Sequence, residues 1–274
     1  MERVSLIGLP AVKGITPHKT WFGSEAAILV VLAAANIRMK FLRQNILSIL
    51  IMCLAVLSVI MSNSVVSILA ALFGLTFWFF IKHARTSSIF LMGICSSVVI
   101  VLVFISMFDI DIFQILLIFN RDSGLTGRGY IWGTWLEVIQ KRVLIGYGYS
   151  GFFGNSIDAP AYAYFGRAGS YMPPNFHNTF LDVTAELGII GLLLFCYPVA
   201  CSLIRLWRVQ SDFGSILLSV AVALLVEAMG ERTFLHHTFL PTFVLFIVIF
   251  YSSSIYIRQC RTDHRSGNTW KTSS

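Results

Sequence analysis

Seven apolar stretches of about the length needed to cross a membrane constrain this chain more than any other feature. A helix needs roughly 20 mostly apolar residues to span the hydrocarbon core of a bilayer. The stretches run over 22–37, 45–61, 64–81, 88–108, 183–204, 213–229 and 238–257. Composition agrees, because 57% of the 274 residues are hydrophobic and only 12% are charged, about half the charge of an ordinary soluble domain. The sequence therefore predicts an all-α polytopic membrane protein, and it excludes a soluble domain or a disordered chain.

Basic residues predict which side of the membrane each connection faces. Lys and Arg gather in short connections on the cytoplasmic side. The connections after the first, third and fifth stretches and the tail after the seventh together hold eleven basic residues, whereas the short connections on the other side hold only Arg232. The N-terminus and the 109–180 loop are therefore predicted to lie outside, with the C-terminus cytoplasmic. The net charge of +7 reflects this sidedness and does not indicate binding to nucleic acid.

This arrangement divides the chain into four parts. They are an outer N-terminal segment with four spans (1–108), an extracytoplasmic loop (109–180), three further spans (181–257) and a basic cytoplasmic tail (258–274). Unstructured loops as long as the second part are uncommon unless they are functional, so we expect the chemistry there. Near the outer ends of three spans stand the acids Glu25, Glu186 and Glu227. They indicate a polar outer cavity, or else each lies at the depth of the lipid headgroups.

The outer loop is predicted to contain a helix from Arg128 to Gln140, capped by Thr126. Arg128, Trp132 and Trp135 recur on one face of this helix. Tryptophans on such a face favour the interface between membrane and water. The helix is therefore expected to be interfacial, and Arg128 then either serves a substrate or simply meets lipid phosphates.

Other patterns in the sequence do not indicate a cofactor or a metal. Residues 146–151 match G-x-G-x-x-G, but a dinucleotide site needs that pattern between a strand and a helix, with an acid about 20 residues on. A glycine-rich turn is the better interpretation. His236 and His237 are adjacent and have no evident third ligand. None of the five cysteines stands in an outer segment where a disulfide would form.

His177 follows Pro173 and Pro174 at the end of the loop, just before the fifth apolar stretch. The prolines stiffen the chain, so the imidazole is predicted to lie at the outer membrane boundary. It can act there as a general base, or it can be a hydrogen-bonded structural residue.

Several short segments together resemble the O-antigen ligase and Wzy-type polymerase superfamily, which includes exopolysaccharide polymerases of the ExoQ kind. The segments are 14–19 (GITPHK), 62–64 (SNS), 126–132 (TGRGYIW), 144–148 (LIGYG), 177–181 (HNTFL), 186–192 (ELGIIGL) and 230–233 (GERT). Their order and predicted outer placement carry the resemblance. Thr20 departs from the family, where many members have Asn after the Lys. Family members also have about five more spans before the first segment, so the chain resembles the second half of a member.

The resemblance implies a GT-C-like fold and a metal-independent, inverting enzyme in the bacterial inner membrane, without a cofactor. Such an enzyme takes a glycan from undecaprenyl pyrophosphate and joins it to a hydroxyl of an acceptor glycan or of lipid A-core, as an O-antigen ligase or a polymerase. His177 is then the expected base, and Arg128 the residue that holds the diphosphate. The other expected substrate-binding residues are Arg121, Arg167, Lys19, Trp132, Glu186 and Glu231.

Two other functions fit some of the same features. A transporter of lipid-linked sugar or another solute would also have a polar outer cavity, although the sequence shows no pair of interrupted spans. The chain could also be a non-catalytic, truncated accessory protein, which would explain why it lacks the front spans of the family.

Overall fold

The computed structural model describes residues 12–14, 16, 18–39, 45–83, 128–154, 157–166, 172–209, 211–234 and 240–265. All regular elements within these ranges are helices, and no strand is present in them. The helices are α1 (Lys19–Met39), α2 (Asn45–Met61), α3 (Val65–His83), α6 (Arg128–Lys141), α7 (Pro160–Phe165), α8 (Thr179–Val209), α9 (Asp212–Gly230) and α10 (Leu240–Arg265).

The helices confirm the prediction of an all-α membrane protein. Four of them, α1, α8, α9 and α10, are long and apolar enough to cross a membrane, and α2 and α3 contain shorter apolar helices. Each lies over one of the predicted apolar stretches, with ends shifted by up to eight residues. The stretch over 88–108 lies outside the described residues, as do Arg121, Thr126 and Arg167. The division into four parts stays a prediction.

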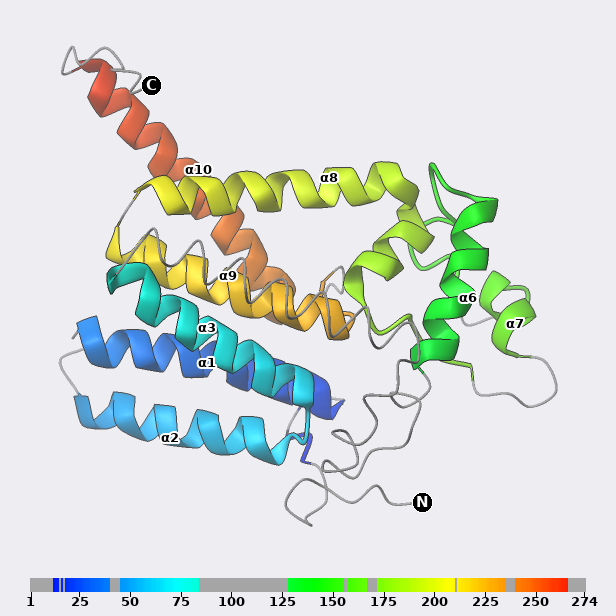
Figure 1. Cartoon of the computed structure of the whole chain (residues 1–274), viewed down its shortest axis with the longest axis horizontal. Coiled ribbons are helices and arrows are strands. Elements are labelled where there is room, and N and C mark those ends of the chain that lie inside the picture. Colours follow the sequence, from blue (N-terminus) through cyan, green and yellow to red (C-terminus); the bar gives the residue numbers. More distant parts are fainter. Residues whose placement is uncertain are drawn as a thin grey trace.

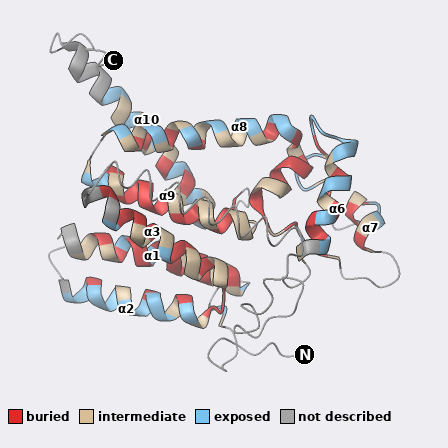
Figure 2. Ribbon diagram, viewed as in Figure 1, coloured by how far each residue is buried: buried red, intermediate tan, exposed pale blue. Residues whose placement is uncertain are grey.

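Small residues hold the centre of the bundle, where α1, α3 and α9 pack together (Figures 1 and 2). A Cβ added to Gly74 of α3 would lie 2.7 Å from Val31 of α1 and 3.0 Å from Ala223 of α9. Close approach of small residues is how membrane helices associate, since lipid removes the hydrophobic driving force between them. Helix α2 packs on α1 and leaves an apolar face exposed (Figure 2), for example at Leu54.

Helix α8 is broken at Gly188, where φ is 70° and ψ is −171°. Its first part, 179–187, lies beside α6, and its second part continues along the bundle (Figure 1). The turn that follows α6 hydrogen-bonds to the backbone on both sides of the break. Tyr147 N donates to Ala185 O at 2.9 Å, and Ile189 N donates to Val143 O at 2.9 Å. Backbone groups released by the break are thus paired again, as an apolar surrounding requires.

The outer unit of α6, α7 and the first part of α8 has its own aromatic core. Phe152, Phe165 and Phe176 are fully buried there. Helix α6 forms where the sequence predicts it, but its two tryptophans face the protein. Trp132 Nε1 donates to Phe176 O at 2.8 Å, and Trp135 Nε1 donates to Leu181 O at 3.0 Å. An indole N–H needs a partner when buried, and the carbonyl of Phe176 in the loop and that of Leu181 in the first turn of α8 provide it here.

The break in α8 gives a prediction for Gly188→Ala. A Cβ at this position would lie 2.1 Å from Leu144 O, and the backbone conformation is one that only glycine adopts readily. We expect the melting temperature of the detergent-solubilised protein to fall by about 5–10 °C. Gly133→Ala on α6 is the matched control, because a Cβ there meets nothing within 4 Å and alanine is the better helix former. Equal melting temperatures for the two variants would contradict the described break.

Candidate active site

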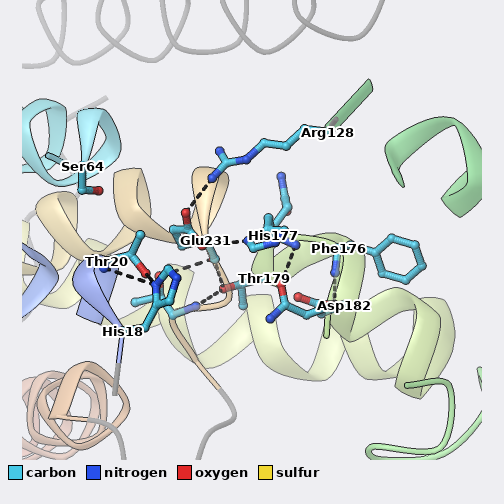
Figure 3. A network of polar contacts seen from close by, with 12 residues as sticks. His18, Thr20, Ser64, Arg128, Phe176, His177, Thr179, Asp182 and Glu231 are labelled. Atoms are coloured by element: carbon cyan, nitrogen blue, oxygen red, sulfur yellow. Dashed lines mark hydrogen bonds and ion pairs between the residues drawn. The ribbon is translucent and has the colours of Figure 1, made fainter. Parts of the chain in front are cut away.

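The carboxylate of Glu231 joins side chains from separate parts of the chain. Glu231 follows α9 directly and leaves it in an extended conformation, with φ −149° and ψ 160°. Its Oε1 accepts a hydrogen bond from Arg128 Nη2 of α6 at 2.6 Å. Its Oε2 lies 3.0 Å from Nδ1 of His177, in the loop before α8 (Figure 3). One acid therefore holds both residues for which the sequence predicts catalytic roles.

The backbone around His177 is fixed from both sides. His177 has φ 52°, a left-handed conformation that is uncommon in residues other than glycine. Its N–H donates to Asn175 Oδ1 at 2.8 Å, and the preceding Phe176 N donates to Asp182 Oδ1 at 2.9 Å. Asn178 then caps α8, because its Oδ1 accepts from Phe180 N at 3.0 Å. Unusual backbone held this firmly is typical of functional sites.

The contact with Glu231 also sets the tautomer of His177. An ionised carboxylate only accepts hydrogen bonds, so Nδ1 must carry the proton that it donates. In the neutral imidazole Nε2 then carries no proton and can accept one, which is the arrangement of a histidine general base oriented by an acid. The His177 side chain is 23% exposed, so it remains within reach of a substrate.

The surroundings keep Glu231 ionised. Burial raises the pKa of Glu231, but the hydrogen bond from His177 and the charge of Arg128 outweigh burial, and the net effect lowers the pKa below its ordinary value. His18, just before α1, also acts on this carboxylate by its charge (Figure 3). Partial burial lowers the pKa of His18, against the opposing effect of Glu231. His18 Nδ1 hydrogen-bonds Thr20 Oγ1 at 2.8 Å.

A second ion pair fixes the segment that carries Glu231. Arg232 Nη2 lies 3.0 Å from Glu186 Oε1 of α8, and the side chains are 13% and 1% exposed. Thr179 Oγ1 donates to Glu231 O at 3.0 Å and accepts from Thr233 N at 2.9 Å. The extended segment after α9 is thus attached to the first part of α8 at Glu231, Arg232 and Thr233.

The structure brings some of the expected site residues together and buries others. Arg128, His177 and Glu231 are in contact, and the charge of Lys19 acts on the neighbouring His18. Trp132 is only 4% exposed and already bonded, and Glu186 is paired with Arg232. Among the described residues, no three His, Cys, Asp or Glu side chains are grouped so that they could hold a metal ion.

Sequence reasoning missed the parts that His18 and Thr179 play at the site. The only signal for His18 was its position before Lys19 in the 14–19 segment. Thr179 directly follows His177 and Asn178, and the sequence around it gives no signal for a role at the site. Its contacts with Glu231 and Thr233 join residues more than 50 positions apart, which spacing alone does not predict.

Comparison with known proteins bears on this region of the chain. A family model described as O-antigen ligase matches residues 47–196, which include Arg128 and His177. The exopolysaccharide production protein ExoQ of Rhizobium meliloti (strain 1021) is 33% identical over 135 residues. The match covers 47% of this chain and 31% of that relative, so the chain spans about a third of the relative's length. No solved structure matches the chain.

The electrostatics of Glu231 give a prediction for Glu231→Gln. The pKa of Glu231 is lowered in the folded protein from an ordinary value of 4.5. Its stabilising effect is therefore present above pH 4.5 and is lost as the pH falls further. We expect Glu231→Gln to lower the free energy of unfolding at pH 7 by about 1–3 kcal/mol. The deficit relative to wild type should shrink below pH 4.5.

Thermal unfolding of both proteins from pH 7 to pH 3.5 measures this difference. Glu137→Gln, on the exposed face of α6, is the matched control and should follow wild type throughout. A Glu231→Gln variant as stable as wild type at pH 7 would contradict the role of Glu231 as the charge that holds Arg128 and His177.

Proposed function

Because this chain belongs to the O-antigen ligase family, we propose that it is a membrane glycosyltransferase that moves a glycan from undecaprenyl pyrophosphate to an acceptor hydroxyl. The acceptor is a growing glycan or lipid A-core, for a polymerase or a ligase respectively. The similar Rhizobium protein is named for exopolysaccharide production, which favours a growing exopolysaccharide. We place the enzyme in the bacterial inner membrane, with the site and the N-terminus on the outer side.

The observation that carries this proposal is the contact of one carboxylate, Glu231, with both Arg128 and His177. Glycosyl transfer from a lipid diphosphate needs a base for the acceptor hydroxyl and a cation for the departing diphosphate. His177 and Arg128 are residues of those two kinds. Glu231 holds one of them on each of its two carboxylate oxygens. His177 can therefore act on the acceptor hydroxyl while Arg128 acts on the departing diphosphate.

The proposed step is a single inverting displacement. Nε2 of His177 takes the proton from the acceptor hydroxyl, and the acceptor oxygen forms a bond to the anomeric carbon. The bond between that carbon and the diphosphate oxygen breaks, and undecaprenyl pyrophosphate leaves with the electron pair. Attack occurs from the face opposite to the leaving group, so the anomeric configuration inverts.

Arg128 has donors left for the diphosphate. Its contact with Glu231 runs through Nη2, and a guanidinium has five N–H groups in a planar fork. The side chain is 19% exposed. We propose that the remaining N–H groups hold phosphate oxygens and supply the positive charge, so that the transfer needs no metal ion. Lys19, Arg121 and Arg167 are proposed as further cationic contacts to the same diphosphate.

Two residues expected to bind substrate are proposed instead to support the site. Trp132 fixes the carbonyl of Phe176, directly before His177. Glu186 holds Arg232, directly after Glu231. Both side chains are buried and act through their neighbours in the chain.

The proposed base gives a prediction for His177→Ala. Positioned general bases contribute about 10²–10⁴-fold in rate, so kcat should fall by that factor while the KM for the lipid-linked donor changes little. The assay incubates purified protein with a defined lipid-linked glycan and separate acceptors, and it identifies the product. Full activity of His177→Ala would remove the proposed role. Passage of the donor across liposomes without a new glycosidic bond would indicate a transporter.

The proposed diphosphate contact gives a prediction for Arg128→Lys. Lysine keeps the charge but loses the planar fork, so donor affinity should fall by about tenfold or more. Arg142→Lys is the matched control, because Arg142 is exposed and stacks on Tyr147, 5.1 Å from the ring centre. Equal donor KM values for the two variants would contradict the proposed fork.

A further inference from the structure

The turn after α6 exposes an apolar tip that the proposed reaction does not use. Val143, Leu144 and Ile145 are consecutive and exposed, the last two by 64% and 69%. Lys141 and Arg142 directly precede them and are exposed as well. Water is a poor surrounding for three adjacent aliphatic side chains, so this tip indicates contact with an apolar medium or partner.

The tip adjoins an exposed apolar side of α8. Ile189 N donates to Val143 O at 2.9 Å, and Ile190 N donates to Leu144 O at 3.3 Å. Both isoleucines are exposed, and the exposed aliphatic surface continues along the second part of α8 to Leu193. Figure 2 shows exposed residues both on α8 and in the turn beside it. The tip is therefore continuous with the surface that a membrane-spanning helix presents to the bilayer.

The length of α8 places the tip at a membrane boundary. A helix rises about 1.5 Å per residue, so the second part of α8, 189–209, is about 30 Å long, which matches the hydrocarbon core of a bilayer. Arg205 and Arg208 stand near its far end, as basic residues do at an interface. The break at Gly188 then marks the other boundary, on the side of the candidate site. Helix α6 runs across the direction of α8 there (Figure 1), so its last turn leads to 143–145 at that depth.

Two cations stand beside the tip. Lys141 contacts Tyr164, with Nζ 5.0 Å from the ring centre, and the guanidinium of Arg142 lies 5.1 Å from the ring centre of Tyr147. Glu137, one turn earlier on α6, acts on Lys141 by its charge. In the described ranges no acid forms an ion pair with Arg142. An ammonium has three N–H donors and a guanidinium five, so both cations keep donors for a ligand.

A phospholipid matches both halves of this surface. Basic side chains at an interface keep their charged ends at the depth of the headgroups, while apolar neighbours enter the acyl region. A soluble anion would leave the aliphatic tip in water, and a purely apolar partner would leave the cations without a counter-charge. Each basic residue near the membrane surface favours an anionic lipid by about fivefold, so two of them favour an anionic headgroup over a zwitterionic one.

We propose that residues 141–145 bind an anionic phospholipid at the membrane boundary, with phosphatidylglycerol as the headgroup to test. Lys141 and Arg142 hold the headgroup, and the aliphatic tip contacts the acyl chains together with Ile189 and Ile190 of α8. The bound lipid stabilises the turn that is bonded across the break in α8. The lipid takes no part in the proposed glycosyl transfer, and the test needs no substrate.

The experiment places a photoreactive side chain in the tip. p-Benzoylphenylalanine replaces Leu144 in the purified full chain, which is reconstituted into vesicles of phosphatidylcholine with a minor fraction of phosphatidylglycerol. After illumination, mass spectrometry identifies the lipid adducts. We expect phosphatidylglycerol adducts to be enriched about tenfold over the bulk lipid ratio. Lys141→Gln combined with Arg142→Gln should return the adducts to the bulk ratio.

Two controls distinguish a headgroup site from general contact with lipid. The same photoreactive residue in place of Leu54, on the exposed face of α2, should give a lipid ratio that does not change when Lys141 and Arg142 are replaced. Arg208→Gln removes an exposed cation at the far end of α8 and should leave the enrichment at Leu144 unchanged.

The absence of lipid adducts at Leu144, or adducts there at the bulk ratio, overturns the proposal. Enrichment that survives the loss of both cations overturns it as well. Salt provides a test that does not depend on the double variant folding. Exposed charges are screened at high ionic strength, so the enrichment in wild type should fall towards the bulk ratio in 1 M NaCl, and enrichment that persists there contradicts a site made by Lys141 and Arg142.

Discussion

The ionised carboxylate of Glu231 is the constraint on which the candidate site depends. A charge with little access to water is tolerated only when it is paired and hydrogen-bonded, and this one is held by Arg128 and His177 from different elements. Each partner in turn needs its own support. The helix α6 must reach the end of α9, and the loop before α8 must adopt the left-handed backbone seen at His177. The outer unit is arranged around these requirements.

The break in α8 makes that arrangement possible. An unbroken helix of 31 residues would continue straight past the end of α9, whereas the turn at Gly188 lets the first part lie against α6. Residues 143–148 replace the missing helical hydrogen bonds. Gly146 is required as well, because a Cβ there would lie 2.5 Å from the backbone of Glu186. The glycine-rich turn thus has a structural role at the break in α8.

The spans could be predicted from the sequence because a membrane helix pairs its own backbone, so local hydropathy and length decide it. Arg128 and His177 could be singled out because both lie at predicted outer positions. There an arginine can hold a diphosphate and a histidine can act as a base. The pairings could not be predicted, since Glu186 meets Arg232 across 46 positions and the spacing carries no signal. The direction of Trp132 was missed for a similar reason. Its partner is the carbonyl of Phe176, and every residue has a carbonyl.

Helix α8 connects the chemistry to the bilayer mechanically. Its first residues adjoin His177, while its second part exposes Leu193, Leu194 and Tyr197 along the bundle. A span answers a change in hydrocarbon thickness by tilting. Because the turn 143–148 is bonded to α8 on both sides of Gly188, a tilt of the second part would act on that turn and on the first part of α8, which adjoins His177. We therefore expect a change in membrane thickness to bear on the geometry of the site.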